Sequence, residues 1–211
     1  MPRSTRRVPF APGEDGTTVT DVVVIGSGMG GLAVATHLHR KGVAVVVLDG
    51  LAEGDAQLRA TLRHATTEQL ERVAACDPVS HDERREILRQ LHGYTKSHAV
   101  DIRRGVVADA LDTAGAHGAD APLRRWVLHT PTGVILCDSL VITGANAHHP
   151  VRRFLHGLGQ ETGESLSTAL RRLGIYLVGV GQQVSAGHRE VLQQARLVGN
   201  TIAGNGLRLP A

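Results

Sequence analysis

The chain opens with an apolar run, a helical repeat and a second apolar run. Val22–Ile25 is four apolar residues, mostly β-branched, which is typical of a strand buried on both faces. Apolar residues then recur at helical spacing from residue 32 to residue 38, and the predicted helix ends at Gly42 after two basic residues. Val43–Leu48 is the second apolar run. The pattern predicts a complete β-α-β unit within residues 21–49.

Helical and extended patterns continue to alternate along the rest of the chain. Helices are predicted for Gln57–Ala75 and for Ser80–His92, the second opened by a capping box of Ser80 and Glu83. The predicted strands cover residues 100–107, 126–130, 134–137, 140–143 and 175–178, and a long helix with one apolar face runs from residue 191 to residue 202. Pro131–Gly133 predicts a hairpin turn. Buried strands alternating with helices predict an α/β fold with a central parallel sheet, to which a β-hairpin or meander is added.

The length of 211 residues predicts one domain, or one domain with a small attachment. Residues 1–20 are polar, contain several prolines and glycines, and lack the apolar stretch of a secretion signal. They are predicted to form a disordered N-terminal arm, and residues 21–211 a single domain. No apolar run approaches the ~20 residues that a membrane span needs, so no membrane partner is expected.

Composition narrows the classes of partner. One Trp, two Tyr and two Phe are few aromatic rings for base stacking, so no nucleic-acid partner is expected. The net charge of +3 arises from 23 basic and 20 acidic residues that are interspersed. Cys76 and Cys137 stand apart without a C-x-x-C motif, which argues against a zinc site or a dithiol redox centre. Reduced thiols favour a cytoplasmic protein, and no metal ligands are assigned.

A glycine motif follows the first predicted strand. Gly26, Gly28 and Gly31 form G-x-G-x-x-G at the start of the predicted helix. In this context the first glycine permits a tight turn, the second lets the backbone approach a pyrophosphate, and the third lets the helix pack close to the sheet. The start of the helix then offers free N–H groups to the phosphates. The alternative is a β-α-β unit that binds no nucleotide.

An acidic residue completes the nucleotide pattern. Asp49 ends the second predicted strand, 18 residues beyond Gly31, where a carboxylate accepts hydrogen bonds from ribose hydroxyls. Because an acid there also disfavours a 2′-phosphate, NADP is not expected. The spacing alone does not distinguish FAD from NAD.

Several stretches of the chain resemble one family of enzymes. "VVVIGSGMGGLA" is similar to the FAD-binding opening of flavoprotein oxidoreductases with two dinucleotide-binding domains, which include the flavin monooxygenases and the glutathione-reductase-like enzymes. "REILRQLHGYTKSHAVDIRRGVV" resembles the helix and strand before the family's central hairpin, and "RWVLHTPTGVILCDSLVITGAN" resembles that hairpin and the A-T-G strand. "GIYLVGVGQQVSAGHREVLQQARLVGNTIAG" resembles the closing strand, turn and last helix. The resemblance implies a Rossmann-like FAD-binding domain.

The resemblance also implies the site residues. Those expected to bind FAD are Gly26, Gly28, Gly30, Gly31, Asp49, Val107, Thr143, Gly144, Gly179, Gly181, Gln182 and His188. His188, His148 and His149 are expected near the flavin ring, where an imidazole stabilises anionic reduced flavin or moves a proton near neutral pH. For each histidine the alternative is a solvated loop residue. Cys137 is interpreted as a core residue and not as a nucleophile.

The chain departs from the family at three places, one of which is that Gly50 and Gly54 follow the acid of the second strand without the family's Gly-Gly pair. Val180 stands where the family has an Asp that binds a ribityl hydroxyl, and Gln182 or Gln183 is the candidate replacement. The family also has an NAD(P)H domain between the A-T-G strand and the closing strand, whereas this chain has only the 29 residues 145–173 there. A dinucleotide-binding domain needs roughly 100 residues, and no second G-x-G-x-x-G occurs. The NAD(P)H domain is therefore predicted to be replaced by a short bridge.

These observations lead to alternative functions. The first is a minimal flavoprotein, an oxidoreductase acting on a small molecule with electrons from the substrate or from a partner reductase; a homodimer or a second subunit would complete its pocket. The second is a redox-neutral or non-catalytic accessory subunit that binds FAD or its ADP half, which the Val180 departure favours. The third is a protein that binds NAD at the single site.

Overall fold

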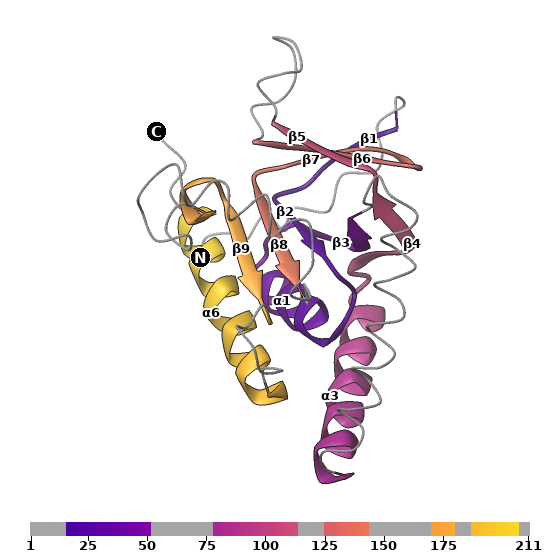
Figure 1. The fold of residues 1–211 in the computed structure, drawn as a ribbon, viewed down its shortest axis with the longest axis vertical. Helices are drawn as coiled ribbons and strands as arrows, with labels where there is room; N and C mark the ends of the chain where they lie inside the picture. The colour runs from indigo at the N-terminus through magenta and orange to yellow at the C-terminus, as the bar shows by residue number, and fades with distance from the viewer. Residues whose placement is uncertain (1–15, 52–77, 114–124, 144–169, 180–186, 207–211) are drawn as a thin grey trace, which may run out of the picture.

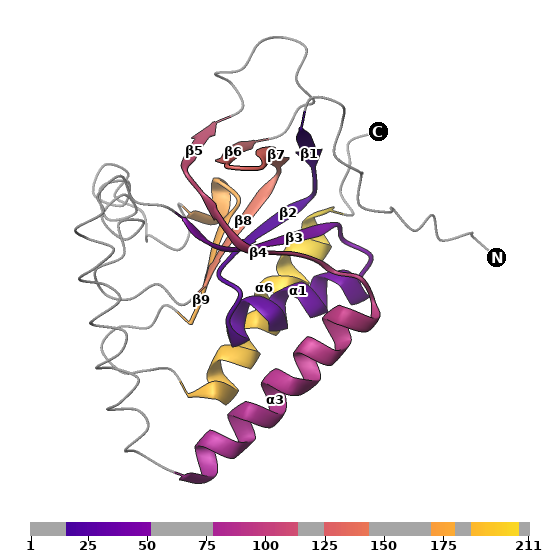
Figure 2. The same cartoon turned by 90° about the vertical axis from the view of Figure 1, so that its right-hand side faces the viewer.

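The computed structural model describes residues 16–51, 78–113, 125–143, 170–179 and 187–206. Its strands are β1 (Thr17–Val19), β2 (Val22–Ile25), β3 (Val45–Leu51), β4 (Asp101–Ala108), β5 (Ala110–Thr113), β6 (Trp126–Thr130), β7 (Gly133–Cys137), β8 (Ser139–Thr143) and β9 (Ile175–Val178). Its helices are α1 (Met29–Arg40), α3 (Pro78–Ser97) and α6 (His188–Gly206). Figures 1 and 2 show a layer of helices, a central sheet and a smaller sheet above it.

The central sheet has the strand order β4-β3-β2-β8-β9, and all of its pairs are parallel. The smaller sheet has the order β1-β7-β6-β5; β1 pairs with β7 in parallel, and the other pairs are antiparallel. β6 and β7 form the hairpin at the predicted turn, where Thr130 pairs with Gly133. The predicted α/β fold, with a parallel sheet and an added hairpin, is confirmed.

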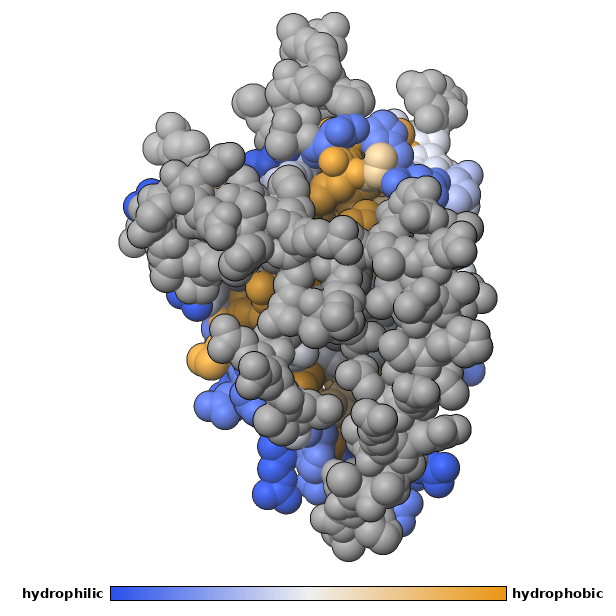
Figure 3. All heavy atoms as spheres, in the orientation of Figure 1, coloured by the Kyte–Doolittle hydropathy of each residue, from blue (hydrophilic) through white to orange (hydrophobic). Residues whose placement is uncertain are grey.

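The central strands are buried on both faces, which explains why they read as unbroken apolar runs. Val23 and Ile25 of β2 face the smaller sheet, where they meet Trp126, Leu128, Ile135 and Cys137. Val22 and Val24 face the helices and pack with Val34, Leu38, Tyr176 and Ile202. Cys137 is buried within the first of these cores, as expected of a core residue. Figure 3 shows hydrophobic residues under the smaller sheet and hydrophilic residues at the end where α3 and α6 begin.

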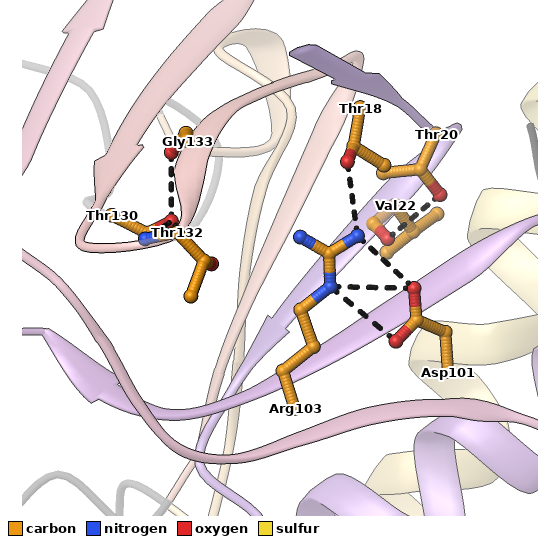
Figure 4. A network of polar contacts seen from close by, with 8 residues as sticks. All are labelled: Thr18, Thr20, Val22, Asp101, Arg103, Thr130, Thr132 and Gly133. Carbon is orange, nitrogen blue, oxygen red and sulfur yellow. Dashed lines mark hydrogen bonds and ion pairs between the residues drawn. The ribbon is translucent and has the colours of Figure 1, made fainter. Parts of the chain in front are cut away.

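A polar contact joins the two sheets at the edge strand β4. Nη2 of Arg103 donates to Oγ1 of Thr18 at 3.0 Å and to Oδ2 of Asp101 at 3.2 Å. Figure 4 shows the guanidinium between the carboxylate of β4 and the hydroxyl of β1. Thr18 is buried, so its hydroxyl needs a partner within the protein. Arg103 thus fastens the short strand β1 to the central sheet.

The structure corrects several boundaries. β1 begins at Thr17, so the predicted disordered arm through residue 20 extends too far. α3 begins at Pro78 and ends at Ser97, so Ser80 lies inside the helix and the predicted capping box is wrong. Proline suits a first helical turn because its missing N–H would have no partner there. β5 was not predicted as a strand, and it exists because it pairs with β6. The predicted helix Gln57–Ala75 lies outside the described residues.

Candidate functional site

The glycine turn lies where the order of the central sheet reverses. From β2 the chain passes to β3 and β4 on one side, and later strands β8 and β9 occupy the other side. Carboxyl ends of parallel strands separate at such a point, and ligands bind there in α/β sheets. Gly26 follows β2 directly, and α1 begins three residues later at Met29. The topology therefore places the turn in the position of a nucleotide site.

Two of the motif glycines are required by backbone conformation and packing, independently of any ligand. Gly26 has a φ of +112°, which L side chains rarely adopt, and its N–H donates to the Leu48 carbonyl at 2.8 Å. A Cβ on Gly31 would collide with the carbonyl oxygen of Gly26. The hydroxyl of Thr143 donates to the carbonyls of Ile25 and Gly26 at 3.1 and 3.2 Å, which ties the end of β8 to the turn. These contacts hold the turn closed and the helix close to the sheet.

Gly28 differs from its neighbours. It is exposed, its φ of −74° and ψ of −172° suit any residue, and a Cβ there would meet no atom within 4 Å. By contrast, a Cβ on Gly30 would lie 3.2 Å from Cγ1 of Val191 on α6 and 3.4 Å from Cγ1 of Val178 on β9. No contact with another described residue explains a glycine at position 28. The open space over it matches the need of a phosphate group for close approach to the backbone.

The first turn of α1 is electrostatically suited to an anion. Gly28 is its N-cap residue and provides no side-chain hydrogen bond, and this turn contains no acidic residue. The first N–H groups of a helix have no intrahelical partner, and the helix dipole adds partial positive charge. The buried side chains of Leu32 and Val34 anchor the helix in the core. The turn therefore combines free donors, positive potential and room for a phosphate.

Asp49 lies at the same edge of the sheet, in an exposed part of β3 where its register with β4 shifts. Its Oδ2 atom accepts a hydrogen bond from the N–H of Gly105 at 2.5 Å. Gly105 has a φ of +72°, so the carboxylate supports a bend in β4. Val107 is half-buried and pairs with Gly50 beyond the shift. Asp49 therefore has a structural partner in the N–H of Gly105, besides any contact with a ribose, and sequence reasoning did not find this partner.

The last helix approaches the turn through its first two turns. Val191 lies against Gly30, and Oε1 of Gln194 accepts from the N–H of Gly179 at 2.9 Å. Gly179 follows β9 and has a φ of +70°. α6 therefore contacts both the start of α1 and the end of β9. Gln194 was missed because its partner is a backbone group that only the fold brings near.

His188 is held by a residue that sequence reasoning assigned to another role. Its Nε2 atom lies 3.0 Å from Oε2 of Glu83 on α3, and Nη2 of Arg189 lies 3.3 Å from Oε1 of the same carboxylate. The side chain of His188 is only 14% exposed, so it is not a solvated loop residue. Glu83, expected in a capping box, instead links two helices.

The contact between Glu83 and His188 can be tested by measuring stability as the pH is lowered. The polar contact with His188, and to a smaller extent Arg189, lowers the pKa of Glu83 below its ordinary value. A lowered folded-state pKa stabilises the protein above the unfolded-state pKa, and this contribution is lost as the pH falls through the folded-state value. We expect the thermal midpoints of parent and Glu83→Gln to differ at neutral pH and to converge below pH ~4. A constant difference down to the acid limit would contradict the role of the carboxylate.

Other predicted site residues are outside the described part of the chain: Gly144, Gly181, Gln182, His148 and His149, together with Val180. Their predicted roles remain predictions. Among the described residues, no group of three or more His, Cys, Asp or Glu side chains is arranged to hold a metal ion. No helix in the described ranges is long and apolar enough to cross a membrane.

The fold and the glycine turn define a nucleotide-binding protein of the Rossmann type. Residues 20–184 match the model of the pyridine nucleotide-disulphide oxidoreductase family, and the chain belongs to that family. No curated protein matches the sequence.

Solved structures resemble the chain in fold at low sequence identity. The crystal structure of THI4 from Thermovibrio ammonificans is 15% identical, with a TM-score of 0.51 over 90% of this chain and 91% of that chain. The thioredoxin reductase of T. acidophilum is 16% identical, with a TM-score of 0.37 over 62% of this chain and 36% of that chain. A flavin monooxygenase from Stenotrophomonas maltophilia is 18% identical, with a TM-score of 0.34 over 59% and 38%. The chain thus spans little more than a third of the length of the latter two.

Proposed function

We propose that this chain is a minimal FAD-binding flavoprotein, an oxidoreductase that acts on a small molecule with electrons from its substrate or from a partner reductase. The family assignment supports redox chemistry. The observation that carries the proposal is the open space over Gly28 at the start of α1, because no contact within the described chain accounts for it. A phosphate of the dinucleotide fits that space and the free N–H groups beside it.

The other residues of the site have separate tasks in this proposal. Asp49 orients the adenosine ribose with the oxygen that Gly105 does not use. Thr143 keeps the turn closed through the carbonyls of Ile25 and Gly26. His188 is the proposed group that accepts or donates a proton, and the Glu83 carboxylate lies beside its Nε2 atom. When bound, FAD supplies the electron or hydride transfer itself, and the protein orients it and shapes its surroundings.

Identification of the bound cofactor tests the proposal. We expect purified protein to be yellow and to release FAD on heating, in about one equivalent, as measured by absorbance and mass spectrometry. Colourless protein that binds ADP but not FAD would instead support a redox-neutral accessory subunit. Release of NAD would support the single-site NAD alternative.

Variants of Asp49 separate its two roles. We expect Asp49→Ala to weaken FAD binding by roughly 1.5–3 kcal/mol, the range for a hydrogen bond to a charged group. The matched variant Asp49→Asn keeps an acceptor for Gly105, so it should retain the stability of the cofactor-free protein and lose less affinity. Titration of cofactor-free protein with FAD and thermal unfolding measure the two effects. Equal FAD affinities in Asp49→Ala and the parent would exclude the ribose contact.

A further inference from the structure

In the described part of the chain, the parallel helices α1, α3 and α6 cover one face of the central sheet, and α1 lies between the other two. Both α3 and α6 pack against α1, and Figures 1 and 2 show that all three begin at the same end of the molecule. That end carries the glycine turn at the start of α1. Any displacement of the beginning of α6 therefore acts on the wall of the candidate site.

Glu83 connects the two outer helices across this end. Its two carboxylate oxygens contact consecutive residues of α6, Oε2 with Nε2 of His188 and Oε1 with Nη2 of Arg189. The His188 contact is sheltered, since that side chain is 14% exposed; its buried Nε2 atom lies against the Glu83 carboxylate as a close polar contact and makes no hydrogen bond of regular geometry within the described residues. Arg189 is 84% exposed, and exposed ion pairs contribute little. The pair with His188 is therefore the main part of the link.

A short series of contacts leads from this link to the phosphate turn. His188 begins the helix, and Val191 N–H donates to the Gly187 carbonyl at 3.1 Å in its first turn. Val191 is also the side chain that lies against Gly30. A carboxylate that fixes His188 thus fixes the position of Val191 against the first turn of α1.

We propose that Glu83 is a positioning residue for the dinucleotide: it fastens the first turn of α6 to α3 and so keeps Val191 packed against Gly30 beside the phosphate turn. This proposal rests on the proposed function, since it assumes that a dinucleotide binds at that turn. It assigns Glu83 no contact with the cofactor. Its effect on affinity passes through His188 and the first turn of α6.

The test compares Glu83→Gln with Glu86→Gln. Glu86 is on the same helix and pairs with Arg89 within α3, so it controls for the loss of one carboxylate. The loss of one side-chain contact of this kind changes an equilibrium by about fivefold to tenfold. We expect titration of cofactor-free protein to show FAD binding about that much weaker in Glu83→Gln and unchanged within about twofold in Glu86→Gln. Equal affinities in Glu83→Gln and the parent would overturn the proposal.

A double-mutant cycle with His188→Gln separates positioning from a general loss of stability. If Glu83 acts through His188, Glu83→Gln weakens FAD binding by no more than about twofold in the His188→Gln background, whatever His188→Gln costs by itself, because the link is already broken there. If the two effects multiply, Glu83 acts by another route and the proposal fails. The conservative variant Arg189→Gln should change affinity less than either.

Hydrogen exchange gives a readout that needs no cofactor. In FAD-free protein, the amides of Val191 and Leu192 should exchange faster in Glu83→Gln than in Glu86→Gln, because a loosened first turn opens more often. If the parent binds no FAD, the proposed function fails, and exchange alone then decides whether Glu83 fastens α6. Unchanged exchange at these amides would refute the link in either case.

Discussion

Gly28→Val should abolish most cofactor binding while leaving the fold intact. A valine side chain there occupies the space over the first turn of α1, where the phosphate is expected. Each lost hydrogen bond to a charged group costs roughly 1.5–3 kcal/mol, so the loss of two weakens FAD binding on the order of 100-fold or more. The dihedral angles of Gly28 suit any residue. Replacement of a capping glycine should cost about 1 kcal/mol at most, or about 2–4 °C in thermal midpoint.

Two control variants make this result specific. Gly93→Val introduces the same side chain at an exposed glycine of α3, where a Cβ also meets no atom within 4 Å, and it should retain FAD. Gly31→Val places a Cβ into the carbonyl of Gly26 and should lower the thermal midpoint far more than Gly28→Val. Measurement of bound flavin and of thermal unfolding on all three variants separates ligand contact from folding. Full FAD content in Gly28→Val would refute the phosphate assignment.

Bound flavin should remain oxidised in excess NADH or NADPH when oxygen is excluded. A hydride donor must sit about 3–3.5 Å from its acceptor in an aligned pose, and the 29 residues 145–173 are too few for a nicotinamide-binding domain. Enzymes typically turn over at about 1–10³ s⁻¹. We expect bleaching by NAD(P)H to take minutes or longer, as followed by stopped-flow absorbance.

Dithionite provides the positive control for that experiment, because it should bleach the same sample at once. Rapid, saturable bleaching by either nicotinamide with the protein alone would contradict the predicted short bridge. Residues 145–173 would then contribute to a nicotinamide site, and no partner reductase would be needed.

The central sheet could be predicted from sequence because its strands are buried on both faces. A run such as Val22–Ile25 has one physical interpretation, since four successive apolar residues need cover on two sides. β1 could not be recognised in the same way. It has three residues, Thr17–Val19, and it is a strand because β7, far along the chain, supplies its hydrogen-bond partners. Short strands of this kind depend on distant neighbours and not on local pattern.

The candidate site was predictable in its backbone and less so in its side chains. The spacing of Gly26, Gly28 and Gly31 located the turn and predicted a packing role for Gly31, and the folded structure adds that a Cβ on Gly31 would collide with the Gly26 carbonyl, whereas one on Gly28 would meet no described atom within 4 Å. Glu83 matched a capping box locally, whereas its partner His188 is 105 residues away. A local sequence pattern carries no information about a contact of that separation, so this link had to come from the folded structure.

The parallel pairing of β2 with β8 has a consequence for the order of folding. β2, α1 and β3 are contiguous in sequence, so they can associate while the chain is still being synthesised. The hydroxyl that closes the glycine turn belongs to Thr143, 118 residues from its acceptor Ile25. Pairing at such separation is intrinsically slow because a long loop must close first. A growing chain therefore contains the whole glycine motif long before it contains a finished binding site, and the cofactor is expected to enter late.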